Sequence, residues 1–378
     1  MNVAFVNENA LGHGSYLPRF VDEFRNRPEL GIVPHLIDVV PMPPAIQRRA
    51  DFTVRGLRRF GLDFHVARWR RVASRHARER VDELLRRQRI DAVVVNTQSV
   101  GLFLGNLPGN PPLHVGLDAT FRQLARTRWF AANRIAAWFL PWTLAPILGL
   151  ERRLFGAASR LWPWSALVRD SLIRDYGFPA DRISVLPPSL DLEGIRLKPN
   201  TDRRGAGERR QILFIGGDFR RKGGPALLEA FRSGLVSRAD LHVVTQSDLG
   251  SEPGLMVHRG VSAQSDAWLE RWSEADVFVF PSTLETFGIV LVEALAFGVP
   301  VVSSRAGAAA DILEEGRAGI LVDPVTPAAL AASVCAVLDD PRAALARAEV
   351  GRDRVARCHD LRRNAARLAD RLKERAVR

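Results

Sequence analysis

Short apolar runs alternate with longer amphipathic segments along nearly the whole chain. Runs rich in β-branched residues predict strands, and the segments between them carry apolar residues at helical spacing. The predicted strands are Val3–Val6, Val33–Val39, Ala92–Asn96, Leu113–Leu117, Arg160–Trp164, Ile183–Leu186, Ile212–Ile215, Leu241–Val244, Val277–Phe280, Pro300–Ser303 and Ile320–Val322. This alternation predicts an α/β fold of two doubly wound, Rossmann-like parallel sheets with helices on both faces.

A stretch rich in proline, glycine and charge, residues 187–210, separates the two alternating halves and is typical of an interdomain linker. We therefore expect an N-terminal domain over 1–188 and a C-terminal domain over 189–352. The tail, residues 353–378, is predicted as one helix and is a candidate to pack back on the N-terminal domain.

Two helical segments of the N-terminal half are unusual. The segment Val66–Ile90 has an apolar stripe at helical spacing, and nine arginines occupy positions 68–89. The segment Ile135–Leu150 is 16 residues long without a charge, which is short of the roughly 20 that a membrane-spanning helix needs. We favour a buried helical hairpin broken by its two prolines. The alternative is an interfacial patch with Trp129, Trp138 and Trp142 at headgroup level.

Composition narrows the class of protein. The 378 residues are 47 % hydrophobic and 25 % charged, which is typical of a globular protein and excludes a collagenous or disordered chain. Two cysteines exclude a disulfide framework. The first residues carry no basic region followed by a long apolar run, so we expect no signal peptide and a cytoplasmic location.

Charge is distributed unevenly. The net charge is +12, and residues 1–190 hold 27 Lys and Arg against 16 Asp and Glu, whereas the second half is nearly balanced. The first half should therefore attract anionic surfaces. A peripheral position at the inner face of a membrane is one candidate consequence.

The strongest chemical signal is the segment 281–300, PSTLETFGIVLVEALAFGVP. A strand ends in a polar loop, and an almost wholly apolar helix begins near Phe287, so its free N–H groups and positive dipole end favour a phosphate. Glu285 in the loop and Glu293 in the helix are separated by about 10–12 Å. That span suits a sugar on one carboxylate and a ribose on the other. The structural alternative is a capping acid and a salt-bridged core glutamate.

A second glycine-rich turn follows the strand Ile212–Ile215, with the sequence GGDFRRKGGP. Glycines allow close backbone approach to a ligand, and Arg221 and Lys222 complement phosphate charge. The turn does not fit a Walker loop, and a plain basic turn is an equally good interpretation of this segment alone.

Together these segments resemble the glycosyltransferases of family 4, also called group 1 glycosyltransferases, which have the GT-B fold of two domains facing a cleft. The resemblance covers residues 160–325 well and the N-terminal half by architecture only. The family's Glu-x7-Glu motif falls on Glu285 and Glu293, and its phosphate-binding lysine on Lys222. The resemblance implies hexosyl transfer from a nucleotide diphosphate sugar, with retention and without a metal or other cofactor.

The resemblance also implies roles for single residues. Glu285 would contact the donor sugar as a catalytic residue. The donor-binding residues would be Arg221, Lys222, Glu293 and the backbone N–H groups of Phe287, Gly288 and Ile289. The family's arginine after the first glycine is Gly217 here, and its His-Asp pair appears as Leu117-Asp118, which makes Asp118 a further catalytic candidate without the histidine.

The loop after the first strand contains Gly12, His13 and Gly14. The resemblance places such a loop over the donor phosphates, with the two glycines donor-binding and His13 catalytic. A histidine with a purely structural role is an equal alternative. A dinucleotide fingerprint is a rival, because Asp38 closes the second strand, but Leu17 stands where the third glycine belongs.

The sequence therefore predicts a glycosyltransferase that acts on a lipid-linked or polysaccharide glycan. The expected partners are a nucleotide sugar, a glycan or glycolipid acceptor and an anionic membrane surface, but no nucleic acid. No metal site is visible, since the spaced acids Asp191 and Glu193 fit helix capping. One alternative is a GT-B-fold nucleotide-sugar epimerase. The other is a nucleic-acid-binding protein that uses the arginine-rich face of residues 66–90, although no nucleic-acid motif is present.

Overall fold

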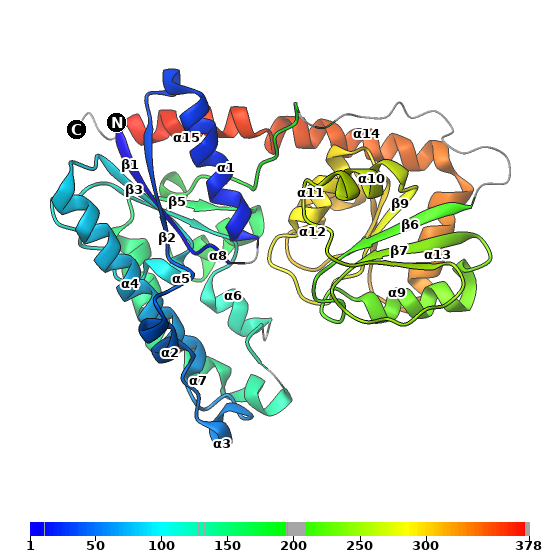
Figure 1. Cartoon of the computed structure of the whole chain (residues 1–378), viewed down its shortest axis with the longest axis horizontal. Helices are drawn as coiled ribbons and strands as arrows, with labels where there is room; N and C mark the ends of the chain where they lie inside the picture. Colours follow the sequence, from blue (N-terminus) through cyan, green and yellow to red (C-terminus); the bar gives the residue numbers. More distant parts are fainter. Residues whose placement is uncertain (11, 128, 132, 194, 196–208, 375–378) are drawn as a thin grey trace. The chain divides into compact units, whose positions relative to one another are not determined.

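The chain forms two compact units in a computed structural model that describes all residues except 11, 128, 132, 194, 196–208 and 375–378. Unit 1 comprises Met1–Ser189 and Leu361–Arg378, and unit 2 comprises Leu190–Asp360. The predicted linker, residues 187–210, lies largely outside the described residues. Each unit is an α/β layer structure (Figure 1).

Unit 1 is built on a five-stranded parallel sheet of order β2-β1-β3-β4-β5. Its strands are β1 Asn2–Asn7, β2 Val33–Asp38, β3 Ala92–Asn96, β4 Leu113–Leu117 and β5 Arg160–Pro163. Its helices are α1 His13–Asn26, η1 Pro28–Leu30, α2 Pro44–Asp51, α3 Arg55–Arg58, α4 His65–Arg87, α5 Gln98–Gly101, α6 Phe121–Arg126, α7 Arg134–Ala157, α8 Ala166–Arg174, η2 Ala180–Arg182 and α15 Leu361–Lys373.

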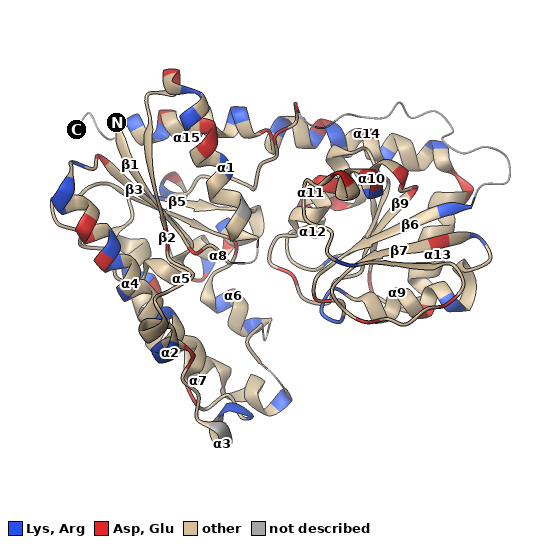
Figure 2. Cartoon of the chain, in the orientation of Figure 1, with Lys and Arg blue, Asp and Glu red and all other residues tan. Residues whose placement is uncertain are grey.

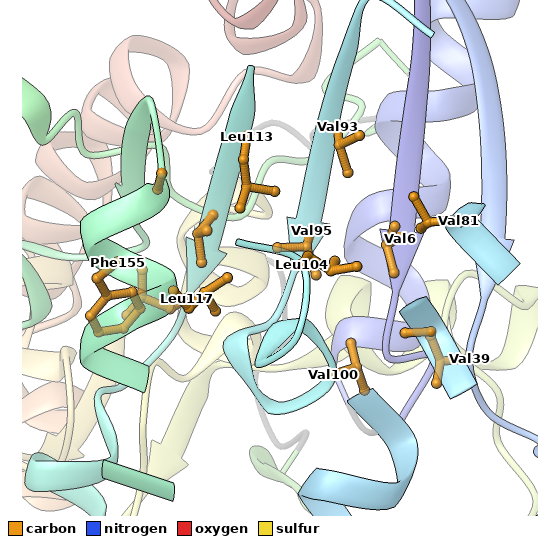
Figure 3. Packing of buried hydrophobic residues seen from close by; sticks show 14 of the residues in the cluster. Val6, Val39, Val81, Val93, Val95, Val100, Leu104, Leu113, Leu117 and Phe155 are labelled. Atoms are coloured by element: carbon orange, nitrogen blue, oxygen red, sulfur yellow. The ribbon is translucent and has the colours of Figure 1, made fainter. Parts of the chain in front are cut away.

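The core of unit 1 lies against this sheet (Figure 3). Val6, Val95 and Leu117 come from three different strands and are completely buried, with Phe155 of α7 and Val81 of α4 in the same cluster. Helices cover both faces of such a parallel sheet, so both faces of each strand are buried. The sequences of these strands are therefore continuous apolar runs.

Unit 2 has a six-stranded parallel sheet of order β11-β10-β9-β6-β7-β8. Its strands are β6 Arg210–Ile215, β7 Ala239–Val244, β8 Leu255–His258, β9 Val277–Phe280, β10 Val301–Ser304 and β11 Ile320–Val322. Its helices are α9 Gly224–Ala230, η3 Phe231–Leu235, α10 Asp266–Glu274, α11 Ile289–Ala296, α12 Ala309–Ile312, η4 Glu314–Gly316, α13 Pro327–Asp339 and α14 Pro341–Cys358.

The predicted fold class is confirmed, and ten of the eleven predicted strands are present within a residue or two of their expected bounds. Ile183–Leu186 is not a strand: only Ile183 forms an isolated bridge, to Leu161, and two prolines follow the segment. Proline cannot donate to a ladder, so pairing stops there. The missed strand is β8, which is short and half-exposed at the sheet edge.

The prediction of one helix over 353–378 is wrong. Helix α14 ends at Cys358, and α15 begins at Leu361. Between them His359 is non-helical (φ −120°, ψ 13°), and its carbonyl accepts from the backbone N–H of Leu190 at 2.8 Å. The break therefore separates α14, which is in unit 2, from α15, which packs on α1 of unit 1.

The predicted hairpin at 135–150 is also wrong, because α7 is a single helix from Arg134 to Ala157. The Asn133 side chain caps it by accepting from the Ala136 N–H at 2.9 Å. Pro141 and Pro146 lie on its exposed side, where a backbone carbonyl that loses its helical partner can reach water. No helix among the described residues is long and apolar enough to cross a membrane.

Glu151 is a fully buried carboxylate on the inner side of α7. It accepts from the Phe121 backbone N–H at 2.8 Å and from the Gln98 amide at 3.3 Å, and the Tyr176 hydroxyl donates to it. Burial raises the pKa of Glu151 to about 7, although these hydrogen bonds oppose the shift. The protonated form is therefore favoured in the folded unit at acidic pH.

We expect the free energy of unfolding of unit 1 to fall as the pH rises from about 4.5 to 7, because the unfolded chain releases this proton before the folded chain does. Glu151→Gln should remove a component of about 3 kcal/mol from that pH dependence. Urea denaturation at several pH values measures it, with the exposed Glu79→Gln variant as the control. A Glu151→Gln curve parallel to the wild-type curve would contradict this account.

Candidate functional site

Two glycine-bearing loops leave neighbouring strands of unit 2 at the same edge of the sheet. Strand β6 pairs with β9 in parallel, with Ile212 opposite Val277. The turn that follows β6 and the loop that follows β9 therefore emerge side by side at the carboxyl ends of the strands. In open α/β sheets that edge is where ligands bind.

An ion pair joins these two loops. Lys222 Nζ donates to Glu285 Oε2, and the two side chains are only 16 % and 7 % exposed. The ammonium also lies 4.8 Å from the centroid of the Phe280 ring, a cation–π contact. Burial lowers the pKa of Lys222, while the Glu285 carboxylate opposes that shift and favours the charged form.

Further hydrogen bonds, from backbone and side-chain donors to backbone carbonyls, hold the two loops together around this pair. The Thr283 N–H and hydroxyl both donate to the Arg221 carbonyl, at 3.1 and 3.0 Å. Arg221 Nη1 in turn donates to the Leu284 carbonyl at 2.9 Å, and its Nε lies 3.3 Å from Asp218. The structure thus uses the Arg221 side chain to position the Glu285 loop, while Arg220 is exposed.

Two glycines make close backbone approaches possible here: Gly223 in the turn after β6, and Gly307 in the segment after β10 that packs against the Glu285 loop. Gly223 has φ +79°, and a Cβ there would lie 1.9 Å from the Pro281 carbonyl oxygen. Gly307 has φ +61°, and its Cβ would lie 2.7 Å from the carbonyl oxygens of Glu285 and Thr286. At Gly217, by contrast, a Cβ would meet no heavy atom within 4 Å, so the close packing of the loops does not explain that glycine.

Helix α11 begins directly after the Glu285 loop. Gly288 is its N-cap with φ +93°, so Gly288 and Ile289 present backbone N–H groups that have no partner within the helix. The Glu285 carboxylate already accepts from the Thr286 N–H at 3.0 Å. Phe287 is buried beside the cap, and Glu293 is a buried charge further along α11. The sequence therefore located this loop–helix junction correctly.

Unit 1 has its own polar cluster at the carboxyl ends of its strands. His13, at the start of α1, lies with Nε2 3.4 Å from Asp118 Oδ2 and with Nδ1 3.2 Å from the Asn96 amide nitrogen. Its ring lies 4.6 Å from the Trp164 ring, centroid to centroid. In the neutral imidazole, Nδ1 accepts from this amide and Nε2 carries the proton toward Asp118. In the cationic form both ring nitrogens are donors, so the Asn96 side-chain amide must turn its oxygen toward Nδ1. His13 thus brings to Asp118 an imidazole that Leu117, buried in the core, cannot supply.

The electrostatics of this cluster favour a cationic histidine. Burial alone would lower the pKa of His13, but the Asp118 carboxylate and the charge of Glu8 outweigh it and raise the pKa. Arg70 contributes a partly buried guanidinium, lying 4.5 Å from the centroid of the Phe130 ring, and desolvation lowers its pKa. Its buried Nε has no hydrogen-bond partner among the described residues.

Sequence reasoning missed Asn96, Trp164 and Arg70. Asn96 could have been found as a polar residue that ends the all-apolar strand β3. Arg70 could not have been found, because the sequence does not show which of the nine arginines on an amphipathic helix points inward.

Gly12 and Gly14 flank His13, and a Cβ on Gly14 would lie 3.3 Å from Asn9 Oδ1.

The remaining sequence candidates have local partners. Asp38 accepts from the Asn7 side-chain amide at 2.8 Å, and Leu17 is buried in α1. The Glu193 N–H donates to Asp191 at 3.1 Å, a local turn. Across the part of the chain that the structure describes, no group of three or more His, Cys, Asp or Glu side chains is placed to hold a metal ion.

Comparisons with known proteins agree with this geometry. Residues 209–340 match the family model described as "Glycosyl transferases group 1". The D-inositol 3-phosphate glycosyltransferase of Paenarthrobacter aurescens is 32 % identical over 213 residues, covering 50 % of this chain and 51 % of that one. The GDP-mannose-dependent alpha-(1-6)-phosphatidylinositol monomannoside mannosyltransferase of Mycolicibacterium smegmatis is 29 % identical over 262 residues, covering 62 % and 67 %.

The fold comparison extends over the whole molecule. The crystal structure of HepE from Anabaena in complex with UDP-glucose superposes with a TM-score of 0.69 at 18 % identity, covering 99 % of this chain and 100 % of that one. The sequence match is narrower, since this chain spans about half the length of the Paenarthrobacter relative. The family match thus lies within unit 2, at residues 209–340, and the chain as a whole has the GT-B fold of the solved glycosyltransferase structures.

Proposed function

We propose that the protein transfers a hexosyl group from a nucleotide diphosphate sugar to a hydroxyl of a glycan or glycolipid acceptor. The observation that carries this proposal is the pairing of Lys222 with Glu285 beside the N-terminus of α11. A cation, a carboxylate and helix N–H groups within one pair of loops suit a diphosphate that carries a hydroxyl-rich sugar.

The two loops and helix α11 bind different parts of the donor. Lys222 holds the diphosphate, with N–H groups at the start of α11 supporting the same charge. When the diphosphate takes over Lys222, the Glu285 carboxylate becomes available to the sugar hydroxyls. Glu293, buried within α11, binds the ribose. We also assign Gly12 and Gly14, which flank His13, to donor binding, as the family resemblance implies.

The reaction breaks the bond between the anomeric carbon and the diphosphate oxygen and forms one to the acceptor oxygen. Lys222 and the α11 terminus stabilise the charge that develops on the departing diphosphate. We infer retention, which requires the acceptor oxygen to arrive on the face from which the diphosphate leaves. The departing oxygen is then within reach of the hydroxyl proton. The donor enters as a substrate, and the proposal includes no metal or other cofactor, so transfer should persist in EDTA.

Unit 1 serves the acceptor in this proposal. His13 and Asp118 form the charged pair at the carboxyl edge of its sheet, and we assign both to the catalytic site. The phosphatidylinositol mannoside acceptor named for the Mycolicibacterium relative supports a lipid-linked glycan as the acceptor class.

A screen of nucleotide sugars by thermal shift, followed by transfer assays with lipid-linked and free glycans, tests the function. We expect one class of nucleotide sugar to raise the melting temperature of the protein. Release of the nucleoside diphosphate should require an acceptor. Conversion of the donor to an epimer without acceptor would instead indicate an epimerase. Stabilisation by nucleic acid alone would contradict both enzyme assignments.

Lys222→Ala should weaken the binding of nucleoside diphosphate by about 1.5–3 kcal/mol, the range for a hydrogen bond to a charged group. Calorimetry with the diphosphate and with the plain nucleoside measures this, and nucleoside affinity should not change. Arg220→Ala, an exposed cation two residues away, is the matched control and should bind like the wild type. Equal losses in both variants would point to general charge rather than a phosphate site.

Substitution of Glu285 and of Glu293 should affect different kinetic parameters. Glu285→Gln should lower kcat by roughly 10- to 1000-fold, the loss of about 1.4–4 kcal/mol of transition-state stabilisation. It should keep or increase diphosphate affinity, because Lys222 loses a competing carboxylate. Glu293→Gln should weaken donor and free nucleotide alike and raise KM. A Glu285→Gln enzyme with weak nucleotide binding and an unchanged kcat contradicts this division.

Asp118→Asn should lower the pKa of His13, because it removes the carboxylate that stabilises the imidazolium. Histidine NMR titration measures this shift directly. If cationic His13 takes part in transfer, the alkaline limb of the pH–rate profile should lie at a lower pH in Asp118→Asn than in the wild type. A shifted pKa with an unchanged pH–rate profile would remove His13 from the catalytic site.

A further inference from the structure

The outer face of α7 exposes large apolar side chains to solvent. Ile135, Trp138 and Trp142 recur at helical spacing and are 53 %, 77 % and 58 % exposed. On the opposite side Leu140, Leu144 and Ile147 are buried in the core of unit 1. A helix in water normally turns polar residues outward, and two exposed tryptophans on one face are therefore a feature that folding does not explain.

A second exposed apolar segment lies next to this face. Phe52 and Val54, between α2 and α3, are 59 % and 41 % exposed, and Leu57 in α3 is 43 % exposed. The residues that follow them contact α7: the Asn133 amide donates to the Arg59 carbonyl at 2.6 Å, and the Phe64 ring lies 4.9 Å from the Trp142 ring, centroid to centroid. We call the residues Phe52, Val54, Leu57, Ile135, Trp138 and Trp142 the apolar tip.

The charge around the apolar tip is predominantly positive, although the exposed Asp51 directly precedes Phe52. Residues 52–62 and 119–150 together contain seven arginines and no aspartate or glutamate. Arg58, Arg59 and Arg134 are exposed beside the apolar tip. The first half of α7 carries no acidic residue, and a basic one marks its start (Figure 2).

We propose that the apolar tip docks the protein on an anionic lipid bilayer. Tryptophan prefers the membrane–water interface, and arginines attract anionic headgroups. A symmetric dimer through the same face would bring an excess of arginines against itself, with Asp51 as an exposed acid at its margin. Nucleic acid would satisfy the arginines but leave the tryptophan and aliphatic side chains without an apolar environment. The bilayer interface satisfies both kinds of side chain.

Helix α4 is the most arginine-rich helix of unit 1, but it is a weaker candidate for the membrane surface than the apolar tip. Arg78 is paired with Asp82 and Arg87 with Glu83 on the same helix, and Arg70 points inward. Trp129, the third expected interfacial tryptophan, is only partly exposed and packs against the core. The membrane contact is thus an apolar surface with a basic margin, not the most arginine-rich helix.

The test is co-sedimentation of the full chain with vesicles of phosphatidylglycerol and phosphatidylcholine, beside vesicles of phosphatidylcholine alone. Binding should need the anionic lipid and should weaken as salt rises from about 0.05 M to 0.5 M, because screening shortens the reach of the arginines. Trp138→Ser/Trp142→Ser should lower the partition coefficient at least about tenfold, since interfacial binding scales with buried apolar area. Both side chains are exposed, so this variant should fold.

Arg86→Gln/Arg87→Gln, at the exposed end of α4, is the matched control and should bind vesicles nearly as the wild type does. Brominated lipids should quench the wild-type tryptophan fluorescence and quench the double tryptophan variant much less. Loss of binding in the α4 variant with full binding in the tryptophan variant overturns the proposal. A wild-type protein that does not bind anionic vesicles at low salt also overturns the proposal.

Self-association is the remaining outcome. A wild type that sediments as a dimer, becomes monomeric on Trp138→Ser/Trp142→Ser and never binds vesicles would assign the apolar tip to a second copy and overturn the proposal. Nucleoside diphosphate affinity, measured on the same variants, should not change. A chain that binds vesicles but no nucleotide would contradict the donor-site proposal and leave this one standing.

Discussion

The ion pair between Lys222 and Glu285 is the interaction on which the proposed donor site depends. It ties the turn after β6 to the loop before α11. A largely buried pair costs desolvation about equal to its Coulombic gain, so stability alone is a weak reason to keep one. Its value is positional: it holds a cation and a carboxylate ready at the carboxyl edge of the sheet. Gly223 and Gly307, where a Cβ would collide with carbonyl oxygens, let the backbone come close enough.

Unit 1 repeats this arrangement with different residues. His13 and Asp118 also come from separate segments and also meet at the carboxyl edge of a parallel sheet. Asn96, whose side-chain amide lies 3.2 Å from Nδ1 of His13, and the Trp164 ring pack beside this pair. In each unit the strands supply a rigid edge, and the loops bring opposite charges together there.

The sequence predicted the parallel strands well, because buried strands leave continuous apolar runs such as Ala92–Asn96. It also located the loops of Lys222 and Glu285, since glycine, charge and strand ends coincide there. It did not predict their direct pairing, which depends on the neighbouring positions of β6 and β9 in the sheet. It mistook α7 for a hairpin because proline usually ends a helix, whereas here both prolines lie on the exposed side. Inward and outward arginines of α4 were indistinguishable without the fold.

The most direct test of the central claim is a crystal structure with a nucleoside diphosphate bound. The account predicts that a phosphate oxygen lies within hydrogen-bond distance of Lys222 Nζ, beside the N–H groups at the start of α11, and that Glu285 has separated from Lys222. A diphosphate bound elsewhere, with the Lys222–Glu285 pair intact, would contradict it.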